Sequence, residues 1–295
     1  MDSSYKAQSL FEVNNLVAVV TGGGSGLGRV ITHALAANGA KAVYILGRRE
    51  DSLKATRDAS SHPQVIHPIV CDVTSKEALA EAAERVRKEI GYCDVVFANS
   101  GVATAMVEDT VLNVANSTVK DVQQSLWKPD MEEFTKSLHV NVTGVFYTAV
   151  AFLDLLDEGN KRGVIAQKSQ VVITSSIAGF VRVIVSSFAY ACSKAAVTQL
   201  GKQLASTLAH FKIRVNTIAP GIYPSEMTDD TLLKGTSNPR DEGSMPKEKI
   251  PLQRAGKEEE IAGAALFLAS AAGGYLDGCV LLTDGGRTSI VPATY

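Results

Sequence analysis

Seven short runs of apolar residues recur along the chain, with helical patterns between them. The runs cover residues 16–20, 42–46, 65–70, 93–99, 171–176, 214–220 and 279–284. Their apolar character is continuous rather than alternating, which is typical of parallel strands buried on both faces. Strands that alternate with helices indicate βαβ units. Seven of them in this order predict a single α/β domain, residues 1–295, with a doubly wound, seven-stranded parallel sheet.

Two long connections interrupt this alternation, and both follow predicted strands. Residues 102–127 follow the fourth strand and residues 222–250 follow the sixth. Open α/β sheets bind ligands beyond the carboxyl ends of their strands, and long loops inside compact domains are usually functional or disordered. We expect residues 102–127 to be an insertion and residues 222–250 to form a substrate-binding region. Alternatively, part of each loop is a variable surface loop without a function.

Composition and charge argue against several classes of protein. Of the 295 residues, 45% are hydrophobic and 20% charged, which is enough apolar material for a sizeable core. The formal net charge of −2 indicates neither nucleic acid nor a membrane surface as a partner. The apolar runs are too short or too interrupted to span a bilayer, and the N-terminal stretch lacks the apolar core of a signal peptide. The four cysteines show no metal-binding spacing, which favours reduced thiols in a cytoplasmic protein.

Residues 21–28 read TGGGSGLG, between a predicted strand and a predicted helix. Glycines let the chain turn sharply and let a pyrophosphate approach the main chain. The helix that follows offers free N–H groups and the positive end of its dipole. The spacing differs from the usual GxGxxG, and a tight turn without a ligand is the alternative. The strand–loop–helix context favours a dinucleotide site of the Rossmann fold.

The second predicted strand ends in Gly47-Arg48-Arg49. At this place the usual fingerprint has an acid that binds the ribose 2′-hydroxyl. A guanidinium here favours a 2′-phosphate instead. The residues therefore predict NADP(H) rather than NAD(H), unless Arg48 and Arg49 only form a solvated helix start.

Tyr190 and Lys194 belong to the sequence YACSK and would share one face of a helix. An ammonium beside a phenol favours the phenolate and lowers its pKa from about 10 toward the range useful for proton transfer. Without further motifs, a Tyr-x-x-x-Lys spacing is common by chance and more often marks two residues on a helix surface than a catalytic pair. Cys192 would face about 200° away from Tyr190, so we expect it to be buried and inert.

Six motifs occur in one order, namely TGxxxGxG at 21–28, ANSG at 98–101, HVNVTG at 139–144, ITSSIAG at 173–179, YACSK at 190–194 and PG at 220–221. Together they resemble the short-chain dehydrogenase/reductase superfamily, over roughly residues 12–287. The stretch PGIYPSEMT and the ending GGRTSIVPATY are similar to fungal reductases grouped with rhamnolipid-type 3-oxoacyl reductases. The chain departs from the family in three ways. The 102–127 connection is longer, Ser176 lies 14 residues before Tyr190 instead of about 13, and PGIYPSEMT has a Pro-Ser pair where many members have Val-x-Thr. In addition, ANSG stands where the family usually has NNAG.

The resemblance implies a role for each matching residue. Tyr190 would be the general acid in reduction, and Ser176 would hold the substrate oxygen. Lys194 would lower the pKa of Tyr190 and bind the nicotinamide ribose. Asn141 would kink its helix and hold a water that relays protons. The implied cofactor-binding residues are Gly22, Gly24, Ser25, Gly26, Leu27, Gly28, Arg48, Arg49, Asp72, Val73, Asn99, Gly101, Tyr190, Lys194, Pro220, Gly221, Ile222 and Ser225.

These residues predict an NADPH-dependent keto reductase or secondary-alcohol dehydrogenase without a metal. The alternatives are NAD-dependent alcohol oxidation, a dehydratase or epimerase of the same fold, and a non-catalytic nucleotide-binding protein. The predicted substrate is an apolar, fairly large ketone, from Ile177, Phe180, Val181, Val183, Ile184 and Tyr223. Trp127 is a further candidate for the pocket wall or for ordinary rim packing. Relatives commonly form homodimers or homotetramers through the helices near 131–157 and 187–210.

Overall fold

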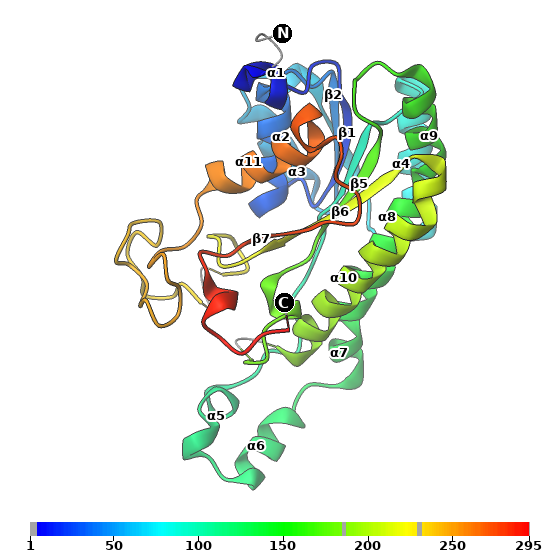
Figure 1. The fold of residues 1–295 in the computed structure, drawn as a ribbon. Coiled ribbons are helices and arrows are strands. Elements are labelled where there is room, and N and C mark those ends of the chain that lie inside the picture. The colour runs from blue at the N-terminus through cyan, green and yellow to red at the C-terminus, as the bar shows by residue number, and fades with distance from the viewer. Residues whose placement is uncertain (1–4, 185–186, 229–231, 295) are drawn as a thin grey trace.

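A seven-stranded parallel sheet forms the centre of the part of the chain that the structure describes (Figure 1). The structure is a computed structural model, and it describes residues 5–184, 187–228 and 232–294. The strands run in the order β3-β2-β1-β4-β5-β6-β7. Their bounds are β1 (Val17–Thr21), β2 (Ala42–Gly47), β3 (Ile66–Val70), β4 (Val95–Ala98), β5 (Gln170–Thr174), β6 (Arg214–Pro220) and β7 (Val280–Thr283). The predicted doubly wound sheet is confirmed.

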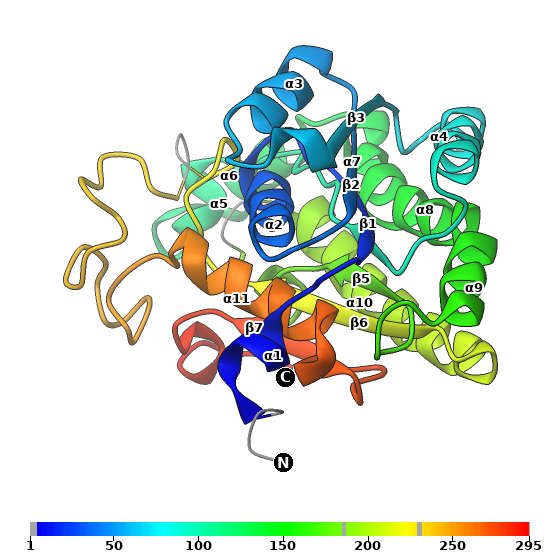
Figure 2. The same cartoon turned by 90° about the horizontal axis from the view of Figure 1, so that it is seen from above.

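Helices cover both faces of the sheet (Figure 2). One layer consists of α2 (Gly26–Ala37), α3 (Glu50–Asp58) and α11 (Glu258–Ala269), and the other of α4 (Lys76–Glu89), α8 (Val145–Ala151), α9 (Leu153–Arg162) and α10 (Phe188–Leu208). A buried apolar cluster joins each layer to the sheet. In β1, Val17 and Val19 belong to one cluster, whereas Ala18 and Val20 belong to the other. This alternation explains why the strands are apolar at every position.

The helical pattern at 131–157 forms several pieces instead of one helix. Helix α7 (Met131–Leu138) passes into a π-helical turn (His139–Gly144), then α8, and the chain bends at Phe152 before α9. Phe152 is fully buried and leaves the helical conformation. Among the described residues no single helix is long and apolar enough to cross a membrane. One bent pair, Met131–Ala151 with Leu153–Arg162, meets that test by length and composition only.

The connection after β4 forms a helical arm that projects from the body of the molecule (Figure 1). It contains α5 (Asp109–Leu112), a short 3₁₀ turn (Val114–Asn116) and α6 (Val119–Leu126). Glu108 anchors the arm, because its carboxylate accepts from Ser125 Oγ at 3.0 Å and Lys128 Nζ at 2.6 Å. Trp127, at the end of α6, is 84% exposed. It therefore lies on the arm surface, which excludes the pocket wall, one of the two places that the sequence left open for it.

The connection after β6 consists largely of turns, with a small core of its own. Leu233, Met245, Ile250 and Ala255 are buried together, and Ile222 packs against them. Residues 229–231 lie outside the described part of the predicted substrate-binding region. Because the described part has its own core, it forms a folded wall beside the carboxyl ends of the strands.

Close packing of α9 on the sheet generates a stability prediction. A Cβ added at Gly159 would lie 2.3 Å from the Cys93 carbonyl oxygen. Because the backbone must move to relieve this overlap, we predict that Gly159→Ala lowers the free energy of unfolding by about 1–3 kcal/mol. At Gly263 of α11 an added Cβ meets no atom within 4 Å. Gly263→Ala is the matched control and should raise stability by up to about 1 kcal/mol. Denaturant titrations measure both, and equal effects would contradict the packing.

Candidate active site

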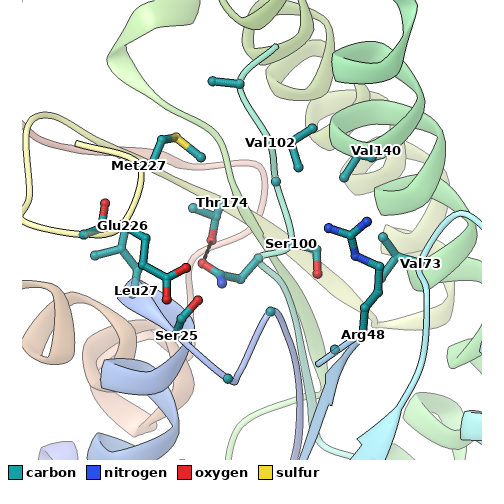
Figure 3. A pocket seen from close by; sticks show the side chains of 18 of the residues that line it. Ser25, Leu27, Arg48, Val73, Ser100, Val102, Val140, Thr174, Glu226 and Met227 are labelled. Atoms are coloured by element: carbon teal, nitrogen blue, oxygen red, sulfur yellow. Dashed lines mark hydrogen bonds between the residues drawn. The ribbon is translucent and has the colours of Figure 1, made fainter. Parts of the chain in front are cut away.

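A cavity of about 800 Å³ opens at the carboxyl ends of the strands (Figure 3). It is lined by the glycine-rich loop after β1, by the loops after β2, β3 and β4, and by the segments that follow β5 and β6. The carboxyl ends of parallel strands meet at one edge of a sheet, which is why residues so distant in sequence converge here. A smaller cavity of about 80 Å³ adjoins it, and Ser176, Tyr190 and Met227 line both.

The glycine-rich loop is folded tightly onto the start of α2. Gly22 has a φ of +68°, and a Cβ at Gly28 would lie 2.2 Å from the Gly22 carbonyl oxygen. Ser25 is the N-cap of α2, but its side chain makes no capping hydrogen bond. The first-turn N–H groups of a helix have no partner within the helix. Since Gly24, Ser25 and Leu27 line the cavity, this loop fits a bound pyrophosphate.

Arg48 and Arg49 both line the larger cavity and are exposed. Arg49 is also the N-cap residue of α3, so the pair lies at a helix start as well as at the cavity. Arg49 Nη2 is 2.8 Å from Glu226 Oε2, in an ion pair whose side chains are largely exposed. Figure 3 shows Arg48 across the cavity from Glu226. The sequence patterns contained no indication of this contact between the loops after β2 and β6.

Asp72 and Asn99 support the floor of the cavity. Asp72 Oδ1 accepts from the Thr74 N–H at 2.9 Å and from the Thr74 hydroxyl at 2.7 Å. Burial raises the pKa of Asp72, but these hydrogen bonds outweigh it, so the pKa lies below its ordinary value. Asn99 Oδ1 accepts from Thr174 Oγ1 at 3.1 Å, while its Nδ2 donates to the Thr21 carbonyl at 3.2 Å. The loop after β4 is thereby fixed to its neighbouring strands.

Tyr190 and Lys194 lie in the first turns of α10, beside Ser176 at the end of β5. Lys194 is only 3% exposed, and its Nζ donates to the Thr174 carbonyl at 2.8 Å. This Nζ is 5.6 Å from the centre of the Tyr190 ring. Burial lowers the pKa of Lys194 from 10.5 to about 8. The Ser187 hydroxyl caps α10 by accepting from the Tyr190 N–H at 3.1 Å.

The pKa of Tyr190 moves opposite to the predicted direction. Burial raises it above 10.0, and a hydrogen bond with Ser176 opposes the rise. The expected lowering by Lys194 does not contribute, because burial desolvates the phenol and also disfavours the charged form of the lysine. The phenol therefore keeps its proton at neutral pH.

Asn141 is fully buried and lines neither cavity. Its Nδ2 donates to the Val102 carbonyl at 2.9 Å and to Ser193 Oγ at 2.8 Å, and its Oδ1 accepts from the Val102 N–H at 2.8 Å. It lies in the π-helical turn, as expected for a residue that distorts its helix. A Cβ at Gly101 would lie 3.3 Å from Asn141 Oδ1 and 3.4 Å from Lys194 Nζ. Asn141 and Lys194 thus flank Gly101 from inside the protein.

The structure brings nearly all predicted site residues to one cavity. Every member of the predicted set lines the larger cavity except Gly28, which lies beneath the loop, Asn141, and Ile222, which lines the smaller cavity. Ser175 is buried, and its Oγ donates to the Lys194 carbonyl at 2.9 Å. Ser175 also lines the larger cavity, but its hydroxyl is bonded to α10, whereas Ser176 lines both cavities.

The predicted apolar wall is only partly present. Ile177 and Val181 line the smaller cavity and Tyr223 the larger, whereas Phe180, Val183 and Ile184 line neither. Cys192 is exposed, so its predicted burial is wrong. The inner face of α10 is occupied by residues such as Ser193 and Val197, which leaves Cys192 on the outer face.

Several lining residues had no signal in the sequence patterns. Met106 comes from the base of the arm, Met227 from the loop after β6, and Arg287 from the C-terminal segment. They are far apart in sequence and belong to no local motif. For Arg287, the one sequence feature that could have indicated a site residue is its position directly after the Gly285-Gly286 turn.

Comparisons with known proteins agree with this geometry. A family model described as enoyl-(acyl carrier protein) reductase matches residues 22–288. The short-chain dehydrogenase/reductase PhomF of Diaporthe leptostromiformis is 42% identical over 294 residues, covering 98% of this chain and 97% of that protein. The rhamnolipids biosynthesis 3-oxoacyl-(acyl-carrier-protein) reductase of Pseudomonas aeruginosa is 30% identical over 277 residues, covering 94% and 97%. The solved Pseudomonas aeruginosa RhlG/NADP active-site complex superimposes with a TM-score of 0.79 at 28% identity, covering 94% of this chain and 98% of that chain.

Burial of Lys194 generates a prediction for the pH dependence of stability. Between pH 8 and 10.5 the unfolded chain retains the Lys194 proton that the folded chain has lost. This group alone therefore makes the free energy of unfolding rise with pH in that window. The Lys194→Met variant lacks this group. As the pH is raised through this window, we predict that its free energy of unfolding falls relative to that of the wild type by up to about 3 kcal/mol. Denaturant titrations of the cofactor-free protein measure the difference.

The matched control is Lys202→Met, which changes an exposed lysine of the same helix. Its stability relative to wild type should stay constant over the same pH range. A Lys194→Met profile that also runs parallel to wild type would contradict the lowered pKa.

Proposed function

The chain belongs to the short-chain dehydrogenase/reductase superfamily, and on that premise we propose that it is an NADPH-dependent ketone reductase. One observation carries this proposal: Ser176 and Tyr190 line both cavities, at the place where the two adjoin. The larger cavity has the glycine-rich loop and the arginines of a dinucleotide site. The smaller one has mainly apolar walls. A ketone in the smaller cavity would therefore present its oxygen to both hydroxyl groups.

When bound in the larger cavity, a nicotinamide cofactor would supply a hydride, with its two electrons, to the carbonyl carbon. Ser176 and Tyr190 would donate hydrogen bonds to the carbonyl oxygen as negative charge grows there. Tyr190 would then transfer its proton to that oxygen, which completes the alcohol. Tyr190 carries its proton at neutral pH, as the acid of a reduction must before it reacts. The Lys194 ammonium would stabilise the phenolate that remains.

Arg48 and Arg49 support NADPH as the cofactor. Both guanidinium groups lie at the end of β2, and no acid occupies the place that would bind a ribose 2′-hydroxyl. A 2′-phosphate there would take the place of Glu226 as the anionic partner of Arg49. Charge-assisted hydrogen bonds of this kind distinguish the phosphorylated cofactor from NADH.

We further propose a homodimer or homotetramer in the cytoplasm. Phe146 and Val150 of α8 and Phe188 of α10 are exposed apolar side chains on the helices expected to pack against a neighbour. A two-fold interface between such helices would bury them. All four cysteines are free thiols, which suits a reducing compartment.

Removing the proposed acid tests the mechanism. We predict that Tyr190→Phe lowers kcat by about 100- to 10,000-fold, because the carbonyl oxygen loses its proton donor. The Kd for NADPH should change little, since the ring remains. Steady-state kinetics and cofactor fluorescence measure the two quantities. Tyr275→Phe, at a fully exposed tyrosine, is the matched control with unchanged kcat, and a Tyr190→Phe enzyme that reduces ketones normally would refute the assignment.

Removing the arginines tests the cofactor. We predict that Arg48→Ala and Arg49→Ala each raise the Kd for NADPH by about 10- to 100-fold, as expected for lost hydrogen bonds to a charged group. The Kd for NADH should remain within about 2-fold, because NADH has no phosphate at this place. Arg57→Ala, in α3 but outside the cavity, should alter neither. Equal weakening of both cofactors, or of neither, would contradict a 2′-phosphate site.

A further inference from the structure

Arg287 brings a buried positive charge to the smaller cavity. It opens a short 3₁₀ turn (Arg287–Ser289) after β7 and is only 9% exposed. It lines the same cavity as Ser176 and Tyr190. The other described residues around it are mainly apolar, including Met106, Ile177 and Val181. Among the described lining residues, Arg287 alone carries a formal charge at neutral pH.

The backbone around Arg287 is held in place by a preorganised turn. Gly285 and Gly286 have φ values of +63° and +85°, in the left-handed region that favours glycine. The Asp284 carboxylate accepts from the Gly286 N–H at 3.0 Å, and from the N–H and hydroxyl of Thr288, both at 2.7 Å. Asp284 therefore fixes the turn that delivers the arginine.

The C-terminal segment that follows is bound to the chain beside Ser176. Arg182 N donates to the Pro292 carbonyl at 2.7 Å, and Thr294 N donates to the Phe180 carbonyl at 2.9 Å. Val181 and Ala293 form an antiparallel bridge between these two contacts. These contacts hold the C-terminal segment beside the smaller cavity, which it reaches through Arg287.

The guanidinium has fewer partners than its donors require. Its Nη1 donates to the Lys249 carbonyl at 2.7 Å. None of the ion pairs formed within the described ranges includes Arg287. Burial lowers the pKa of Arg287, and the negative charge of Asp284 opposes this shift without a hydrogen bond to the guanidinium. A buried charge without a close counter-charge is unfavourable, so an anionic group of a ligand in this cavity would complement Arg287.

We propose that Arg287 binds a carboxylate of the substrate, so that the protein reduces an apolar ketone bearing a carboxylate group away from the reacting carbonyl. This inference rests on the proposed function. The planar guanidinium matches a carboxylate through two parallel N–H···O bonds. Apolar walls between Arg287 and the hydroxyls of Ser176 and Tyr190 would hold the carbon skeleton. The carboxylate would then fix which carbonyl meets those hydroxyls.

The first test uses the unmodified enzyme and NADPH. The probes are 4-benzoylbutyrate and its methyl ester, which share one ketone and differ in the charge of the distant group. We expect a kcat/KM at least 10-fold higher for the acid, in line with a charge-assisted hydrogen bond. An ester reduced as well as the acid would overturn the proposal while leaving the reductase assignment intact. If NADPH is bound but neither probe nor a panel of neutral ketones is reduced, the proposed function itself fails.

The second test replaces the arginine. Arg287→Met should lower kcat/KM for the acid by about 10- to 100-fold and change the ester by less than about 3-fold. Arg287→Lys keeps the charge and should recover part of the activity toward the acid. Arg182→Met is the control, since Arg182 is exposed and adjoins the same wall; it should alter neither value. An equal loss with both probes in Arg287→Met would assign the residue a structural role and refute the inference.

The third measurement separates binding from turnover and from folding. Calorimetric titration of the NADP⁺ complex with 4-benzoylbutyrate, a pair in which neither partner can supply a hydride, should give a Kd at least 10-fold lower than titration with its methyl ester. Arg287→Met should remove this difference. A thermal melt shows whether loss of the Lys249 contact unfolds the variant. If it does, the comparison of acid and ester in the wild-type enzyme decides the question alone.

Discussion

The junction between β5 and α10 fixes the geometry of the whole site. Lys194 Nζ donates to the Thr174 carbonyl, while Ser175 Oγ donates back to the Lys194 carbonyl. Each side of the junction thus holds the other, and the backbones approach so closely that a Cβ on Gly179 would lie 2.6 Å from the Ala195 nitrogen. These contacts set the register of the helix against the strand. Ser176 directly follows β5, and Tyr190 precedes Lys194 by one helical turn. The fixed register therefore directs both hydroxyls to the place where the two cavities adjoin.

The remaining parts of the site are arranged around this junction by the parallel sheet. The glycine-rich loop, the arginines after β2 and the loop after β4 all arrive at the same edge. Asn141 ties the loop after β4 to Ser193 of α10, which connects the cofactor side of the site with the junction. The C-terminal segment closes the other side and carries Arg287. The chain thus separates a polar compartment from a mainly apolar one, with two hydroxyls between them.

The sequence predicted the sheet and most of the site, because those features depend on local pattern. Continuous apolar runs mark buried strands, and the motifs stand directly at strand ends. The misjudged features depend on tertiary contacts. The helix at 131–157 breaks where Phe152 turns into the core. Cys192 and Trp127 lie on outer surfaces that their sequence neighbours do not reveal. Arg287 reaches the cavity only because the C-terminal segment pairs with residues near Phe180.

We propose that this junction serves hydride transfer from NADPH to a ketone, with Tyr190 as the acid. The most direct measurement follows the hydrogen itself. The protein is incubated with a ketone and with NADPH in which both hydrogens at carbon 4 of the nicotinamide are deuterium, and the product is analysed by mass spectrometry and NMR. We expect an alcohol with deuterium on the carbinol carbon, formed in step with NADPH consumption. NADPH consumed without deuterium in the product, or an unchanged ketone beside tightly bound NADPH, would contradict it.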